Sequence, residues 1–191
     1  MNQVMRTLVL MSLLSLAGPA QAATVLTDEA DHAALIAADP GAGEPFVVDF
    51  EELQLGATVA EQYAADGLHL FSPDALVVLP EAFGADARGT QLAVVGFDPE
   101  GEAELVLTFD EPQRTLSGWF VDGEGELLVE GFLAGVLVES VALDVDGEGI
   151  DGGVFRALWF DGQIDEIHFL APSAEDGFGI DDRAPALPGS V

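Results

Sequence analysis

Short stretches of alternating apolar and polar residues fill most of the chain after residue 45, and turn residues separate them. The clearest is Ala103–Phe109, in which every second residue is apolar. Asp-Gly and Glu-Gly pairs mark the breaks between stretches. No helical periodicity follows residue 40. These features predict an all-β fold, an antiparallel β-sandwich of the jelly-roll or carbohydrate-binding-module kind.

The predicted strands are short and closely spaced, and the first is expected to pair with the last. They cover Phe46–Glu51, Gly67–Phe71, Ala75–Leu79, Gln91–Val95, Ala103–Phe109, Leu116–Phe120, Leu127–Leu133, Val136–Leu143, Val154–Phe160, Ile164–Leu170 and Phe178–Asp181. Asp161-Gly162 is expected to be a tight turn, as is Ala134-Gly135. Ahead of them, Ala23–Leu26 could add an edge strand, and a helix capped by Thr27 should end at Asp39-Pro40-Gly41.

The first 22 residues have the pattern of a secretory signal peptide. Arg6 supplies a basic start, Leu8–Leu16 an apolar centre and Ala20-Gln21-Ala22 a small-residue cleavage site. The apolar run is too short to span a bilayer. We therefore expect 1–22 to be a signal peptide, 23–45 a lead-in, 46–183 the sandwich and 184–191 a flexible tail. The expected location is extracellular or at the cell surface, with the periplasm as an alternative.

The chain is strongly acidic, with 35 acidic residues against 5 basic ones and a net charge of −30. Such a surface repels phosphate backbones and anionic lipid heads, so neither nucleic acid nor a membrane surface is an expected partner. Two interpretations of the charge stay open: solvation in salty surroundings, as in halophilic proteins, and binding of divalent cations.

Motifs for catalysis are missing from the sequence. There is no cysteine, which excludes thiol catalysis and thiolate metal sites. The sequence has no G-x-S-x-G nucleophile elbow, and its three histidines form no metal-binding motif. His69 and His168 are expected on strand surfaces, and His32 is expected to be a solvated surface residue. We therefore predict that the protein is not an enzyme.

Carboxylates at the ends of the first and last strands suggest a calcium site, because Ca²⁺ takes six to eight oxygen ligands. If these strands are neighbours, Glu51 and Asp181 would converge, with Asp49 and Asp182 beside them. Four close carboxylates repel one another unless a cation or protons intervene. The acidic loop Asp144–Asp151 is the alternative site, although it has no Glu at the position where an EF-hand needs one.

Two tryptophans are the candidate ligand-binding residues. Trp119 and Trp159 each alternate with residues expected to face inward, so either could form a sugar-stacking platform on an outer sheet face. Packing in the core or cover by a neighbouring loop is the alternative for both.

The segment after residue 46 resembles the opening of exported bacterial β-sandwich proteins of the PEP-CTERM-associated type. The shared pattern consists of Phe50-Glu51, Gly56, Gln62-Tyr63, Gly67-Leu68 and Phe71, and FGIDD at 178–182 resembles the closing strand of that group. The tail has no apolar anchor or basic stop, which departs from surface-sorted members. The resemblance implies a sandwich similar to carbohydrate-binding modules, often with a structural Ca²⁺ near the joined chain ends.

The expected function is that of a non-enzymatic exported module that binds extracellular polysaccharide or matrix. Two alternatives stay open: a purely structural matrix or surface component, and a glycan-active hydrolase. The sequence does not indicate an oligomeric state.

Overall fold

The computed structural model describes residues 23–39, 48, 50–73, 76–80, 91–95, 103–121, 125–145, 153–171 and 178–181. Within these residues the secondary structure is almost all strand, with one α-helix and two short 3₁₀ helices. The elements are β1 (Thr24–Leu26), α1 (Glu29–Ala38), η1 (Phe50–Glu52), β2 (Thr58–Val59), η2 (Ala64–Asp66), β3 (Leu68–Phe71), β4 (Leu76–Pro80), β5 (Gln91–Val95), β6 (Ala103–Val121), β7 (Glu126–Leu133), β8 (Val136–Asp144), β9 (Val154–Ala171) and β10 (Phe178–Asp181). None of the helices in these ranges is long and apolar enough to cross a membrane.

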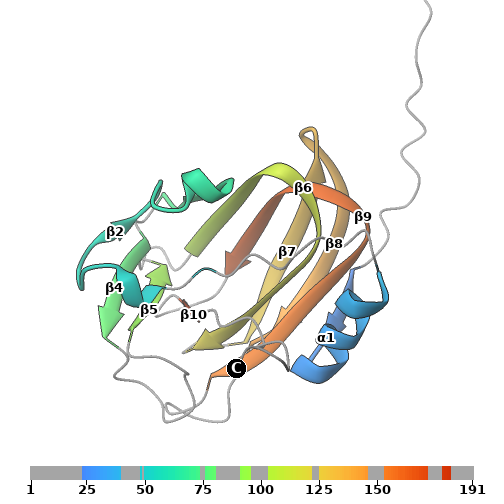
Figure 1. Cartoon of the computed structure of the whole chain (residues 1–191), viewed down its shortest axis with the longest axis horizontal. Coiled ribbons are helices and arrows are strands. Elements are labelled where there is room, and N and C mark those ends of the chain that lie inside the picture. Colours follow the sequence, from blue (N-terminus) through green and yellow to red (C-terminus); the bar gives the residue numbers. More distant parts are fainter. Residues whose placement is uncertain are drawn as a thin grey trace, which may run out of the picture.

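Two long strands, β6 and β9, run side by side and organise the fold (Figure 1). Their first pairing region joins 103–108 to 166–171, and their second joins 115–120 to 154–159. The register shifts on either side of Gln113, between the two regions. Irregularities of this kind let a strand bend and pass from one sheet to another.

The described strands form one continuous ten-stranded sheet, which bends in the middle of β6 and β9 into two layers, here called the first and the second sheet. The first sheet has the order β2-β4-β5-β10-β6-β9-β1, and the second has the order β3-β6-β9-β7-β8. Every pairing is antiparallel. The prediction of an all-β, sandwich-like fold is therefore confirmed.

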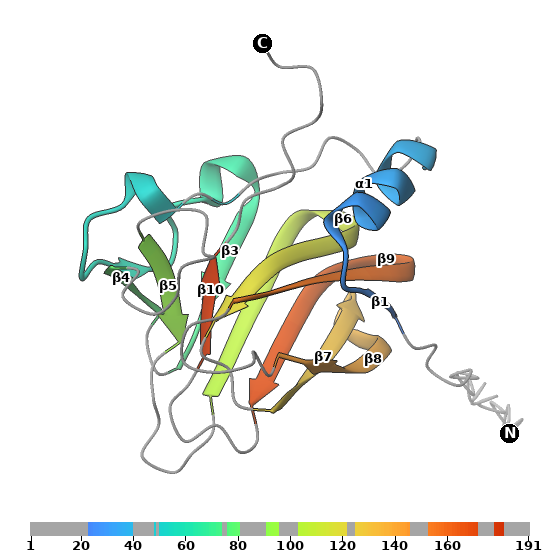
Figure 2. The same cartoon turned by 90° about the horizontal axis from the view of Figure 1, so that it is seen from below.

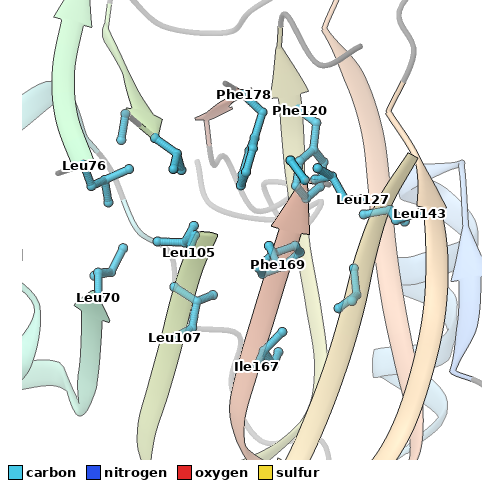
Figure 3. Packing of buried hydrophobic residues seen from close by; sticks show 14 of the residues in the cluster. Leu70, Leu76, Leu105, Leu107, Phe120, Leu127, Leu143, Ile167, Phe169 and Phe178 are labelled. Carbon is cyan, nitrogen blue, oxygen red and sulfur yellow. The ribbon is translucent and has the colours of Figure 1, made fainter. Parts of the chain in front are cut away.

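The apolar core lies between the two sheets. Phe120 of the first sheet and Phe169 of the second are both buried, and their ring centroids are 5.8 Å apart. Figure 3 shows their neighbours, among them Leu105, Ile167 and Phe178, turned into the same interior. Removing a buried aromatic ring of this kind costs about 3–5 kcal/mol.

The β7–β8 hairpin forms as predicted. Ala134 and Gly135 connect its strands, with φ values of 52° and 74°. Positive φ at both central residues is typical of the two-residue turns that match the twist of a hairpin. The Asp165 carboxylate accepts the Ala134 N–H at 3.0 and 3.1 Å and holds this turn against β9.

The predicted turn at Asp161-Gly162 is wrong, because β9 continues through it from Val154 to Ala171. The break in alternation that suggested a reversal is the bend where β9 changes sheet. The same correction applies to β6, which joins the predicted strands Ala103–Phe109 and Leu116–Phe120 into one.

The predicted pairing of the first and last strands is also wrong. Phe50 and Glu51 lie in η1 rather than in a strand. β10 has the predicted bounds, but β5 and β6 occupy its two edges. The buried Phe50 anchors this segment to the core through packing, and its ring meets Tyr63 edge-on at 6.0 Å.

Helix α1 begins one residue later than predicted. Asp28 caps it, and one carboxylate oxygen accepts the N–H groups of Ala30 and Asp31 at 2.7 and 3.2 Å. The preceding strand β1 pairs with residues 157–159 of β9. The short connection brings the helix back over the first sheet, where it lies beside β1 and β9 (Figure 2).

Candidate functional site

The outer face of the first sheet, here called the covered face, carries both candidate tryptophans. Residues paired directly across β6 and β9 point to the same side of the sheet, so Thr115 and Trp119 of β6 share this face with Phe155 and Trp159 of β9. Trp119 is half-buried, and its ring meets Phe155 at 6.0 Å in an edge-on arrangement. This places Trp119 in packing rather than on an open platform.

Arg114 covers the other tryptophan. Its guanidinium carbon lies 5.5 Å from the centre of the Trp159 ring, within the range of a cation–π contact. The guanidinium also contacts the Asp39 carboxylate at 2.7 Å and donates to the Asp161 carbonyl at 3.1 Å. Asp39 follows the end of α1, so this contact fastens the helix to the sheet.

His32 on α1 is buried, with 2% of its surface exposed, so its predicted solvation is wrong. Its Nε2 lies 2.7 Å from the Thr115 hydroxyl, which itself donates to the Leu158 carbonyl at 2.8 Å. Because the hydroxyl proton is used there, Nε2 must carry the imidazole proton and donate it. Burial lowers the pKa of His32, which is neutral in this site.

Glu139 on β8 is a second buried ionisable group, with 3% of its surface exposed. At the bend of β9 the backbone loses its ladder partners, and the Glu139 carboxylate accepts the Gly162 N–H at 3.1 Å. Burial raises the pKa of Glu139, and the hydrogen bonds from the Gly162 and Asp161 backbones oppose this effect. Glu139 therefore accepts a backbone N–H at the corner of the fold, in a buried setting that disfavours its charged form.

The outer face of the second sheet, here called the open face, carries exposed aromatic and aliphatic side chains. Phe71 is 63% exposed, and Leu128 is 37% exposed. Phe132 and His168 are half-buried, and their ring centroids are 4.8 Å apart. Strand pairing aligns Phe71, Val106 of β6, His168, Glu130 and Ser140 in one row across five strands.

Carboxylates hold His168 in place on the open face. Its Nε2 lies 2.8 Å from Glu166, and its Nδ1 lies 3.3 Å from Glu104. A histidine held on both ring nitrogens has a fixed orientation, and its two carboxylate partners keep further lone pairs for an incoming hydroxyl donor.

A second histidine has the same arrangement at the edge of the open face. His69 Nδ1 lies 2.8 Å from Glu61, and Nε2 lies 3.3 Å from Asp110. Hydrogen bonds to Glu61 and then to Asp110 raise the pKa of His69. Sequence reasoning placed both histidines on strand surfaces, which is confirmed, but missed the aromatic residues beside them. The available signal was the alternation within Leu68–Phe71, which puts His69 and Phe71 on the same outward side.

An apolar cavity of about 60 Å³ lies between the sheets, bordered by residues such as Leu70, Leu107, Phe120 and Arg156. A cavity of about 150 Å³ is the size that admits benzene. This cavity is therefore too small for a sugar ring. Arg156 bridges the sheets at this point by donating to the carbonyls of Asp144 and Phe155.

The candidate calcium ligands are only partly described by the structure. Asp49 and Asp182 lie outside the described residues, and Asp181 is described through its backbone alone. Glu51 is exposed and accepts the Gln91 N–H at 2.8 Å at the start of β5. Because Ala93 pairs with Ile180, the register brings this end of β5 beside the end of β10. Among the described residues, no group of three acidic, histidine or cysteine side chains is placed to hold a metal.

Within the segment that carries the sequence resemblance, the two glycines lie at turns, whereas Phe50-Glu51 lies in η1 and Leu68 and Phe71 lie in β3. Gly56 and Gly67 have φ values of 79° and 81°, a region that favours glycine. Gln62 accepts the Ala60 N–H at 2.6 Å and donates to the Thr58 carbonyl at 2.8 Å. Comparison with protein-family models and with curated proteins finds no match for this chain.

Proposed function

We propose that this protein is an exported, non-enzymatic β-sandwich module that binds a neutral extracellular polysaccharide on its open face. The observation that carries the proposal is the exposed ring of Phe71 and the half-buried ring of Phe132 beside two carboxylate-held histidines on that face. Export rests on the signal-peptide pattern of residues 1–22.

The chemistry of the open face suits a sugar chain. A sugar ring has apolar C–H faces that stack on aromatic side chains and hydroxyls that need hydrogen-bond partners at its rim. Phe71 and Phe132 supply the apolar contacts, and Glu104, Glu130 and Glu166 supply acceptors. Three strand spacings separate β3 from β7, about 14 Å, which fits several linked sugars rather than one.

The charge of the protein selects among polysaccharides. With a net charge of −30, the chain repels uronic-acid and sulfated glycans at low salt. A neutral polymer meets no such barrier, and it binds without releasing counter-ions. We therefore expect little dependence of glycan affinity on salt, in contrast to the salt dependence of ligands recognised by charge.

The test compares two exposed apolar residues in neutral-polysaccharide binding, measured by affinity electrophoresis and calorimetry. Phe71→Ala removes a ring from the open face, whereas Leu55→Ala removes a 52% exposed side chain from the turn before β2. We expect Phe71→Ala to weaken binding about tenfold, because an aromatic contact contributes about 1.5 kcal/mol at most. Leu55→Ala should bind like the parent.

Two results would overturn the proposal. If no neutral polysaccharide in a broad panel binds, with or without calcium, the module has the structural role that the sequence leaves open. If both variants weaken binding equally, the sugar does not lie on the open face. Hydrolysis of a bound glycan by the parent would instead favour the hydrolase alternative.

A structural calcium ion remains a prediction that accompanies this proposal. The start of β5 brings Glu51 near the end of β10, where the sequence has further carboxylates. Ca²⁺ should raise the melting temperature more than Na⁺ does at matched ionic strength, and Glu51→Gln together with Asp181→Asn should abolish that difference. Glu126→Gln with Asp66→Asn is the matched control, since both side chains are exposed and lie elsewhere. A parent-like response to Ca²⁺ in the first double variant would exclude this site.

A further inference from the structure

One edge strand of this sandwich differs from the other described edges. β1 has 3 residues, β2 has 2 and β3 has 4, lengths that offer little backbone for pairing. β8 has 9 residues, and β7 is its one ladder partner among the described strands. A long edge of this kind is a template for another strand.

The side chains of β8 also differ from the acidic surface around them. The strand contains no proline, lysine or arginine, the residues that protect natural edges. Its carboxylates are those of Glu139, which is buried at the bend of β9, and Asp144, which ends the strand. Val136 and Leu137 are 62% and 42% exposed. In the described part of the chain this edge is thus a nearly uncharged strip, where a second acidic copy meets little charge repulsion.

We propose that two copies of this chain form a two-fold dimer by antiparallel pairing of their β8 strands. The bulge between Gly131 and Phe132 lies near the turn of the hairpin, so Glu139–Leu143 keep a regular ladder with β7. The Asp144 carbonyl, at the end of the strand, already accepts a hydrogen bond from Arg156 and lies outside the proposed pairing. Pairing centred on Ser140 places Val138 against Ala142 of the second copy. It also places Glu139 against Val141, so the two buried carboxyls do not face each other.

The dimer would join the second sheets of both copies into one continuous sheet. Their open faces would then share one surface across the two-fold axis. This inference concerns self-association and does not depend on glycan binding. If the open face does bind polysaccharide, pairing would make the assembly bivalent and raise its apparent affinity for a polymer.

Salt should control the association, because the protein as a whole is acidic whereas the paired strip is nearly neutral. Sedimentation should show monomers at low salt and dimers at molar salt, where the Debye length falls to about 3 Å. Ala142→Asp places a charge on the proposed interface. Leu128→Asp is the matched control, because Leu128 pairs with Ala142 and shares its exposed side one strand further in. We expect at least a tenfold weaker dimer for Ala142→Asp and a parent-like dimer for Leu128→Asp.

Cross-linking tests the register directly, since the chain has no cysteine of its own. Ser140→Cys should form a disulfide-linked dimer rapidly at molar salt, whereas Glu130→Cys, which lies opposite it on β7, should not. Circular dichroism of each variant checks that the sheet is intact. A parent that stays monomeric at molar salt, equal dissociation of both aspartate variants, or equal cross-linking of both cysteine variants would each overturn the proposal.

Discussion

The covered face and the open face are built by the same two strands and differ in what lies on them. On the covered face, α1 buries His32 against Thr115, and Trp119 packs on Phe155. On the open face, Phe71 stays 63% exposed. Two outer sheet faces of one sandwich thus differ because a single ten-residue helix docks on one of them.

The histidines show the same contrast in their electrostatics. Burial lowers the pKa of His32, whereas hydrogen bonds to Glu61 and Asp110 raise the pKa of His69. His32 therefore favours the neutral imidazole and His69 the charged one. For these two histidines, the direction of the pKa shift follows from burial or from hydrogen-bond partners in the fold.

The largest expected effect is on stability, and it separates the two faces. Trp119→Ala should lower the free energy of unfolding by about 2–3 kcal/mol, somewhat less than a fully buried aromatic ring, because Trp119 is half-buried. Phe71→Ala should change it by no more than about 0.5 kcal/mol. Chemical denaturation measures both. Equal losses would remove the distinction between a covered and an open face.

Salt should have the next largest effect. At a net charge of −30, self-repulsion dominates the long-range electrostatics, and molar NaCl screens most of it. The melting temperature should rise by several degrees, and a gain of about 1 kcal/mol corresponds to about 2–4 °C for a chain of this size. A melting temperature that does not change with NaCl would contradict the halophilic interpretation.

Neutralising Glu139 should stabilise the corner that joins the two sheets. Its raised pKa means that its contribution to stability is full below the ordinary pKa of a glutamate and is lost as pH rises through the folded value. Glu139→Gln should therefore raise the melting temperature at neutral pH and flatten its dependence on mildly acidic pH. Glu126→Gln removes one exposed charge elsewhere on the same hairpin and serves as control. An equal gain in both variants would mean that net charge alone is responsible.

The smallest expected effect is the opposite titration of His32 and His69. The favourable contribution of neutral His32 is present above its ordinary pKa of 6.5 and is lost as pH falls through its lower folded value. The contribution of His69 is present below 6.5 and is lost as pH rises through its higher folded value. Proton NMR of the imidazoles, assigned with His32→Gln and His69→Gln, should show midpoints on opposite sides of 6.5. Midpoints in the reverse order would contradict the assigned environments.

Much of the strand content could be predicted because alternation depends only on local sequence. Gln91–Val95 and Phe178–Asp181 have the predicted bounds, and the Ala134-Gly135 hairpin is confirmed. Which strands pair with each other could not be predicted in the same way. The Asp161-Gly162 sequence is equally compatible with a turn between two strands and with a bend inside one strand. Only the pairing of β9 with β6 on both sides of these residues decides between the two structures.

The candidate site was predicted less well, for a related reason. The alternation correctly puts Trp119 and Trp159 on an outer face, but it contains no information about a helix more than 70 residues away in sequence that docks there. The burial of Glu139 could have been predicted, because Glu139 alternates with Val141 and Leu143 and therefore points inward with them. The exposure of Phe71 depends on where the second sheet faces solvent, which is a property of the assembled fold.

The most direct test of the account is an amide and indole NMR titration with a neutral polysaccharide that binds the parent protein. If the open face is the binding surface, shifts should concentrate on β3, β7 and the parts of β6 and β9 between them, around Phe71, Phe132 and His168. The indole signals of Trp119 and Trp159 should stay unchanged, because packing covers both on the opposite sheet. Shifts centred on the two indoles, with the open face unaffected, would contradict the account.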